Sequence, residues 1–153
     1  MKIRNLIIGG VAISCLCLTA AHSAYVFKKS KEFEKKMDLS EDSLDEIVAF
    51  GGKKKNYSDQ KMKDLKVGAF CGGMDMDLSE VVADEGDYRM DIEIHNGGIN
   101  VVIPKNFKLN LVDRVKFGGV NDETICEDPK NAVSLSVRAD VCFGGLNFEN
   151  PQN

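Results

Sequence analysis

The 153-residue chain is poor in the residues that build metal and redox sites. It has no tryptophan, three prolines and two histidines, and none of its five cysteines forms a C-x-x-C pair, so a zinc ribbon and a dithiol redox motif are excluded. Its 20 Lys and Arg are outnumbered by 24 Asp and Glu, so no cationic excess is available for nucleic-acid phosphates. With 43% apolar residues, the chain is too apolar to be disordered throughout and too short for two full catalytic domains.

The same scarcity leaves little material for catalysis. His22 lies in an apolar N-terminal run and His95 at the corner of a repeat, so at most one histidine is available to the rest of the chain. The sequence therefore does not place a nucleophile, a base and an orienting group together. The cysteines outside the N-terminal run have no histidine at metal-ligand spacing; they are Cys71, Cys126 and Cys142. We expect no enzyme activity, no cofactor and no metal site.

What is present first is an uncharged run over residues 5–27. As a helix it would span roughly 34 Å, enough to cross a bilayer. Residues 1–27 are therefore predicted to be a retained membrane anchor, with a cleavable signal peptide and export as the alternative. Five lysines between residues 28 and 36 follow the run, against Lys2 and Arg4 before it, which favours a single-pass protein with a cytoplasmic carboxyl-terminal domain. Free thiols beyond the run would suit that reducing compartment.

A charged segment follows, with five lysines and seven acids in residues 28–46. We interpret it as a solvated juxtamembrane linker. The polar residues 40–42 ahead of Leu44, Ile47 and Val48 favour a short helix there. The triplet at 53–55 is all lysine; it either attracts anionic lipid headgroups or forms a solvated end of the next domain.

The main signal is a repeat marked by adjacent glycines. Five Gly-Gly pairs follow one another at steps of 21, 25, 21 and 26 residues, which is typical of a repeat architecture. The pairs are Gly51-Gly52, Gly72-Gly73, Gly97-Gly98, Gly118-Gly119 and Gly144-Gly145.

The flanks of the pairs predict short strands. The position after the pair is apolar in four of the five repeats and the next position is polar in all five, an alternation typical of half-buried strands. The apolar positions should form one buried column of Met74, Ile99, Val120 and Leu146. Strands are predicted at 74–78, 88–94, 99–103, 107–112, 132–137 and 146–148.

Stacked glycine corners favour an all-β domain over residues 47–153, a short right-handed β-helix of about four to five rungs. Glycine pairs inside strand sequence mark corners where side chains are not wanted. The alternative is an antiparallel β-sandwich with five glycine turns. A β-helix leaves open edges at both ends, and these invite self-association.

Four motifs in this order resemble the carboxyl-terminal domain of LiaF-like proteins, the cell wall-active antibiotics response family. They are F-C-G-G at 70–73 with Asp77 and Leu78, G-G-I-N-V-V-I-P at 97–104, F-G-G-V at 117–120 and F-G-G-L at 143–146. The resemblance covers about two thirds of the chain, residues 47–148. Two features depart from the family pattern: one candidate membrane span instead of several, and Cys71 inside the second F-G-G.

The resemblance implies a non-enzymatic regulator at the cell membrane. Members of the family carry this domain on the cytoplasmic side and restrain or tune a membrane sensor kinase that responds to cell-envelope damage. The expected partners are the lipid bilayer and a membrane protein such as a sensor kinase, without nucleic acid. Two alternatives stay open: a membrane-anchored scaffold that self-assembles through its β-helix ends, and an exported surface module.

Overall fold

The computed structural model describes residues 24–25, 28, 31–32, 35 and 44–152. The chain divides into two compact units, Met1–Lys36 and Met37–Asn153, and the second holds all the strands. The predicted anchor lies almost entirely outside the described residues. Within those that are described, no helix has the length and apolar character needed to cross a membrane.

Eight strands make up the described part of the second unit, residues 44–152, and the all-β character of this part is confirmed. Each Gly-Gly pair separates an earlier strand from a later one, except that β5 and β8 run through their pairs as single long strands. The strands are β1 Leu44–Val48, β2 Gly51–Asn56, β3 Leu65–Phe70, β4 Gly72–Asp77, β5 Asp87–Val102, β6 Phe107–Val115, β7 Gly118–Asp122 and β8 Val133–Glu149.

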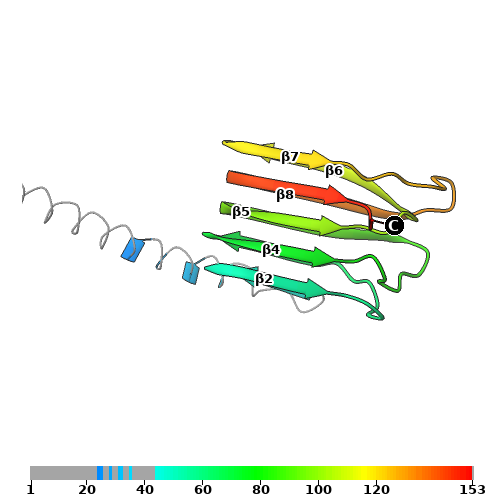
Figure 1. Ribbon diagram of the computed structural model, residues 1–153, viewed down its shortest axis with the longest axis horizontal. Coiled ribbons are helices and arrows are strands. Elements are labelled where there is room, and N and C mark those ends of the chain that lie inside the picture. Colours follow the sequence, from blue (N-terminus) through cyan, green and yellow to red (C-terminus); the bar gives the residue numbers. More distant parts are fainter. Residues whose placement is uncertain (1–23, 26–27, 29–30, 33–34, 36–43, 153) are drawn as a thin grey trace, which may run out of the picture. The chain divides into compact units, whose positions relative to one another are not determined.

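Every pairing between these strands is parallel. On the side before the glycine pairs the spatial order is β1, β3, β5, β8, β6, and on the side after them it is β2, β4, β5, β8, β7. Figure 1 shows the second series as a stack of strands. The sheet is solenoid-like and nearly closed, and the antiparallel sandwich is wrong.

The last strand of the chain is not the last strand of the stack. β8 lies between β5 on one side and β6 and β7 on the other (Figure 1). Neighbouring repeats in the sequence are therefore neighbours in space for the first three repeats, but the fifth is inserted between the third and the fourth. The expected stacking of successive coils fails at this point, because glycine spacing marks the corners without saying which corner lies above which.

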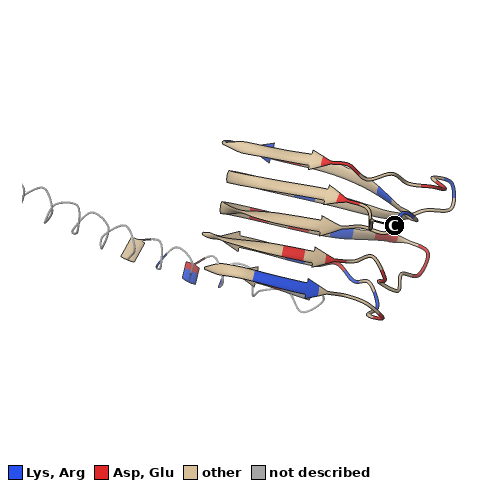
Figure 2. Cartoon of the chain, viewed as in Figure 1, with Lys and Arg blue, Asp and Glu red and all other residues tan. Residues whose placement is uncertain are grey.

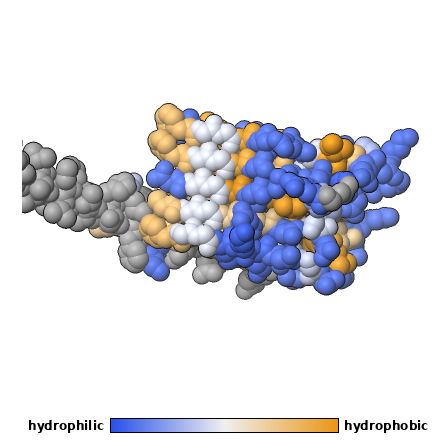
Figure 3. All heavy atoms as spheres, in the orientation of Figure 1, coloured by the Kyte–Doolittle hydropathy of each residue, from blue (hydrophilic) through white to orange (hydrophobic). Residues whose placement is uncertain are grey.

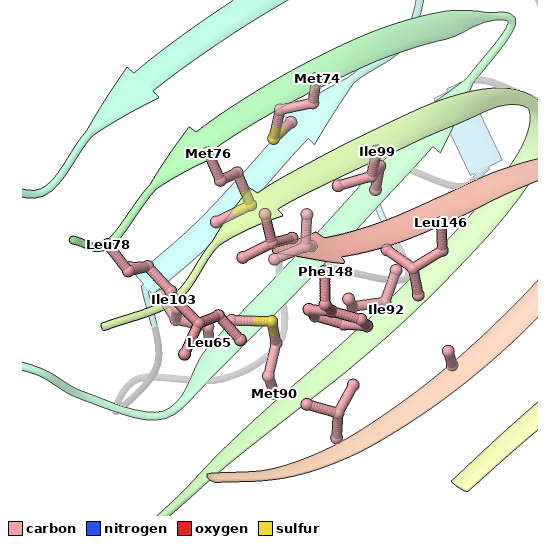
Figure 4. Close-up of a cluster of buried hydrophobic side chains, with 14 of the residues drawn as sticks. Leu65, Met74, Met76, Leu78, Met90, Ile92, Ile99, Ile103, Leu146 and Phe148 are labelled. Atoms are coloured by element: carbon pink, nitrogen blue, oxygen red, sulfur yellow. The ribbon is translucent and has the colours of Figure 1, made fainter. Parts of the chain in front are cut away.

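The core lies between the two sides of the folded sheet. Alternate residues of each strand point inward, and Figure 4 shows side chains such as Met76, Met90 and Phe148 converging from different strands. Met76 and Met90 are 1% and 0% exposed. Burying an apolar side chain of this size contributes about 1.5–3 kcal/mol each.

The structure also revises the start of the domain. Leu44–Val48 form β1, paired with β3, where a short helix was expected. Pairing to a preformed strand outweighs the helix-start signal, because helix propensity is weak beside tertiary contacts. The strands β2, β3 and β7 were not predicted, since glycine and lysine dilute their apolar alternation.

Candidate binding groove

The first glycine of four of the five pairs packs closely against the neighbouring repeat, and only a Cβ on Gly51, on edge strand β2, would meet nothing. A Cβ built on Gly72 would come within 2.6 Å of the Gly51 carbonyl oxygen. Cβ atoms on Gly97, Gly144 and Gly118 would overlap the carbonyl oxygen of Gly72, Gly97 and Gly144, respectively. The stack therefore requires glycine at this position wherever another repeat lies above it.

The second glycine of each pair is under no such constraint. A Cβ on Gly73 or Gly98 would lie 3.7 Å from the nearest backbone oxygen, an ordinary contact, and one on Gly52 or Gly119 would meet nothing within 4 Å. On Gly145 the nearest atom would be 4.0 Å away. None of these five has the left-handed backbone that favours glycine. Neither crowding nor conformation explains why all five repeats lack a side chain here.

These second glycines form the floor of an open groove of about 840 Å³. Figure 3 shows it as a pale stripe that crosses the strands, with hydrophobic surface alongside. Glycine inside a strand is unfavourable unless a bend, a ligand or another backbone needs the space. The floor residues, in spatial order, are Gly52, Gly73, Gly98, Gly145 and Gly119.

One wall of the groove is a ladder of side-chain amides. The Asn121 amide nitrogen donates to Asn147 Oδ1 at 2.9 Å, and Asn147 Nδ2 donates to Asn100 Oδ1 at 2.7 Å. Asn100 Nδ2 in turn donates to Glu149 Oε1 at 2.9 Å. The row continues to the β2 edge as Asp75 and Lys54, whose charged atoms are 3.4 Å apart. This wall offers hydrogen-bond donors and acceptors held in fixed positions.

Aromatic side chains stand on the other side of the glycine pairs. Phe117 and Phe143 stack with ring centroids 4.6 Å apart and are 61% and 53% exposed. Phe143 has a φ of 59°, a left-handed conformation that costs a bulky residue roughly 1–2 kcal/mol. An exposed ring on a strained backbone contributes little to folding, which makes it a candidate contact for a partner.

The β1–β2 edge carries a buried ion cluster. Glu46 is 5% exposed, and its carboxylate oxygens lie 2.5 Å from Lys53 Nζ and 2.8 Å from Lys55 Nζ. Figure 2 shows the concentration of positive charge on β2. Two members of the predicted lysine triplet thus turn inward, and Lys54 is the exposed one.

The cluster shifts two pKa values. Burial alone raises the pKa of Glu46, but hydrogen bonds from Lys53 and Lys55 and their charges outweigh it, so the pKa falls below the ordinary value. The pKa of Tyr57 is raised, first by burial and then by the nearby Glu46 carboxylate. Glu46 is therefore held charged and Tyr57 neutral. The alignment of the repeats indicates an inward position for Lys53, because Lys53 occupies the position that the predicted core column fills in the other repeats.

The predicted site residues come together as rows. The core column runs Met74, Ile99, Leu146, Val120 in space; the first three are buried and Val120, on edge strand β7, is half-buried. Corner glycines lie in register between neighbouring strands. The sequence treated both glycines of a pair alike, whereas only the second ones line the groove.

The described part of the chain holds no cluster of three His, Cys, Asp or Glu side chains arranged for a metal ion. His95 Nε2 lies 3.0 Å from Glu93 Oε1 of its own strand. Cys71, Cys126 and Cys142 are free thiols. In the register of β5 and β8, His95 lies opposite Cys142, whereas Cys71 follows β3 and Cys126 lies in the connection between β7 and β8.

No protein family, curated protein or solved structure was found to match this chain.

Proposed function

We propose that the chain is a non-enzymatic binding protein whose glycine-floored groove receives an extended segment of a partner protein. The observation that carries the proposal is the row of five second glycines, which the fold does not require. A floor without side chains lets a backbone approach closely, the asparagine ladder supplies hydrogen bonds, and Phe117 and Phe143 supply apolar contact. We further propose that the stack is a right-handed β-helix of five coils, since parallel crossovers are right-handed in about 98% of cases.

The LiaF-like motifs support a more specific role. We propose that the partner is a membrane sensor kinase and that the chain tunes its response to cell-envelope damage. In this role residues 1–27 anchor the chain in the cell membrane and the β domain faces the cytoplasm. The motifs all include a Gly-Gly pair, so the resemblance and the groove rest on the same residues.

Filling the groove tests the proposal. Gly98→Leu and Gly145→Leu each add a side chain to the floor at a position where a Cβ fits. The matched control is Ser136→Leu, which adds the same side chain at an exposed position of β8 before its glycine pair. We expect the groove variants to fold with unchanged or higher thermal stability. They should abolish the chain's effect on the cell's transcriptional response to wall-active antibiotics, and deletion of residues 44–153 should do the same.

Two results would count against the proposal. A normal antibiotic response from folded Gly98→Leu and Gly145→Leu chains would show that the groove is not the contact. A normal response after deletion of residues 44–153 would remove the signalling role altogether.

A further inference from the structure

The stack ends in two unsatisfied edges. Among the described strands, β1 pairs only with β3 and β2 only with β4 at one edge, while β6 and β7 pair only with β8 at the other. Each edge therefore presents one row of backbone N–H and C=O groups without a strand partner. Such edges template further strand pairing unless charge or shape prevents it.

The inward-pointing positions of the two edges carry opposite charge, whereas the outward positions of β6 carry the cations Lys108 and Arg114. At the β6–β7 edge the residues that point inward include the exposed acids Asp113 and Asp122, beside the half-buried Val115 and Val120. At the β1–β2 edge the inward cluster contains two lysines and one glutamate, so its net charge is positive. The neighbouring Lys54 has a side chain that is 88% exposed. At these inward positions, contact between two β6–β7 edges, or between two β1–β2 edges, would bring like charges together; contact between unlike edges would not.

The register within the stack predicts which residues would meet. Through β8, β5 and β4, the row of Asp122 leads to Lys55, and the row of Val120 leads to Lys53. On the other side, the row of Val115 leads to Val48. A second copy placed in the same parallel register would thus set an acid beside a lysine and a valine beside a valine.

Asp113 is the exception, because its row leads to Glu46. Glu46 is already bonded to both Lys53 and Lys55, so the cluster that Asp113 would approach carries a net positive charge. The repulsion is therefore offset within the same edge.

We propose that the β6–β7 edge of one copy pairs with the β1–β2 edge of a second copy, head to tail, extending the parallel sheet from chain to chain. Such a contact is heterologous and does not close on itself, so it grows into short linear assemblies. The row of second glycines would continue from Gly119 of one copy to Gly52 of the next, lengthening the groove. The proposal goes beyond the proposed function, because it requires no partner other than the chain itself.

Sedimentation velocity of the purified full-length chain in non-ionic detergent tests the proposal, because it measures the association state over a wide range of protein and salt concentrations. We expect open-ended association that weakens as salt rises. Asp122→Lys should weaken association by at least about tenfold, since it places like charges at the contact. Asp122→Asn, which keeps an oxygen to accept from Thr124, should be intermediate, and Asp87→Lys, an equal charge change at the exposed start of β5, should have no effect.

A mixing experiment identifies the heterologous contact. Lys54→Glu changes the charge of the β1–β2 edge, at the end of the groove wall where Lys54 pairs with Asp75, and should also weaken association on its own. Mixed with the Asp122→Lys chain, which keeps its basic edge, it should restore pairing. A chain that stays monomeric at every concentration overturns the proposal. A closed dimer that Asp122→Lys leaves unchanged also overturns it, because such a dimer would form through another part of the chain, such as the N-terminal run.

Discussion

Adjacent glycines of one pair should respond to the same substitution with opposite sign. In Gly97→Ala the new Cβ overlaps the Gly72 carbonyl oxygen, and both strands are held in the middle of the stack. Overpacking a well-packed interior costs about 1–3 kcal/mol, and moving one strand also weakens its ladder, so we expect a loss of about 3 kcal/mol or more. A small domain has only about 5–15 kcal/mol of stability in total.

Gly98→Ala adds the same methyl group one residue later, where the nearest backbone oxygen would be 3.7 Å away. Alanine restricts the unfolded chain more than glycine does, so the free energy of unfolding should stay the same or rise by about 0.4–1 kcal/mol. Gly72→Ala should fall between the two, because its Cβ would be 2.6 Å from Gly51 and edge strand β2 can move away. Urea unfolding followed by circular dichroism measures all three. Equal losses for Gly97→Ala and Gly98→Ala would refute the distinction between packing glycines and groove glycines.

Three further outcomes follow from the structure. The lysines lower the pKa of Glu46 below its ordinary value of 4.5, so the charged carboxylate stabilises the fold above that pH and this contribution is lost as the pH falls through the lowered pKa. Glu46→Gln should therefore be less stable than the wild type at neutral pH and should lose less stability on acidification. Urea unfolding at a series of pH values measures both. Removing residues 133–153 should leave β6 and β7 without any strand partner, so hydrogen exchange should show no protection there; protected β6 and β7 amides would contradict the inserted position of β8. Cys71 has a φ of 52°, a left-handed conformation that asparagine adopts more readily than cysteine. Cys71→Asn should therefore raise the thermal midpoint, by a gain in stability of less than about 1 kcal/mol. A lower midpoint would mean that the packing of the thiol outweighs the backbone effect.

Much of the fold could be predicted because the glycine pairs repeat. The first glycines mark places where one backbone lies against another, and alternation around them identifies Met74, Ile99 and Leu146 as inward-pointing. Both patterns are local in the sequence, so they can be recognised without knowing which strand pairs with which. They yield an all-β stack of parallel strands.

The order of the stack could not be predicted in the same way. Nothing local in the sequence shows which repeat lies beside Val120 and which beside Leu146, because four of the five repeats have the same apolar position after the glycine pair. The insertion of β8 depends on the connections 103–106 and 123–132. Their turn residues indicate that the chain reverses direction there, but not which existing strand the next strand will pair with. Long-range strand order is decided by packing of the whole set of strands.

The groove was missed for a different reason. A sequence shows two adjacent glycines, and only the fold distinguishes Gly97, whose Cβ would overlap a neighbouring strand, from Gly98, whose Cβ would make an ordinary contact. The ion cluster was closer to being visible, since Lys53 occupies a core position in the alignment of repeats. An inward lysine needs an acid, and Glu46 stands at an inward position of the preceding strand.

Photo-crosslinking in cells tests whether the glycine floor receives a partner protein. A photoreactive phenylalanine analogue at position 143 or 117 replaces an exposed ring beside the glycine pairs and leaves the floor open, and the same residue at position 136 places it on β8 before the glycine pair. We predict a covalent adduct with one membrane protein from position 143, reproduced from position 117 and not from position 136. Equal adducts from all three positions, or none from positions 143 and 117, would contradict binding in the groove.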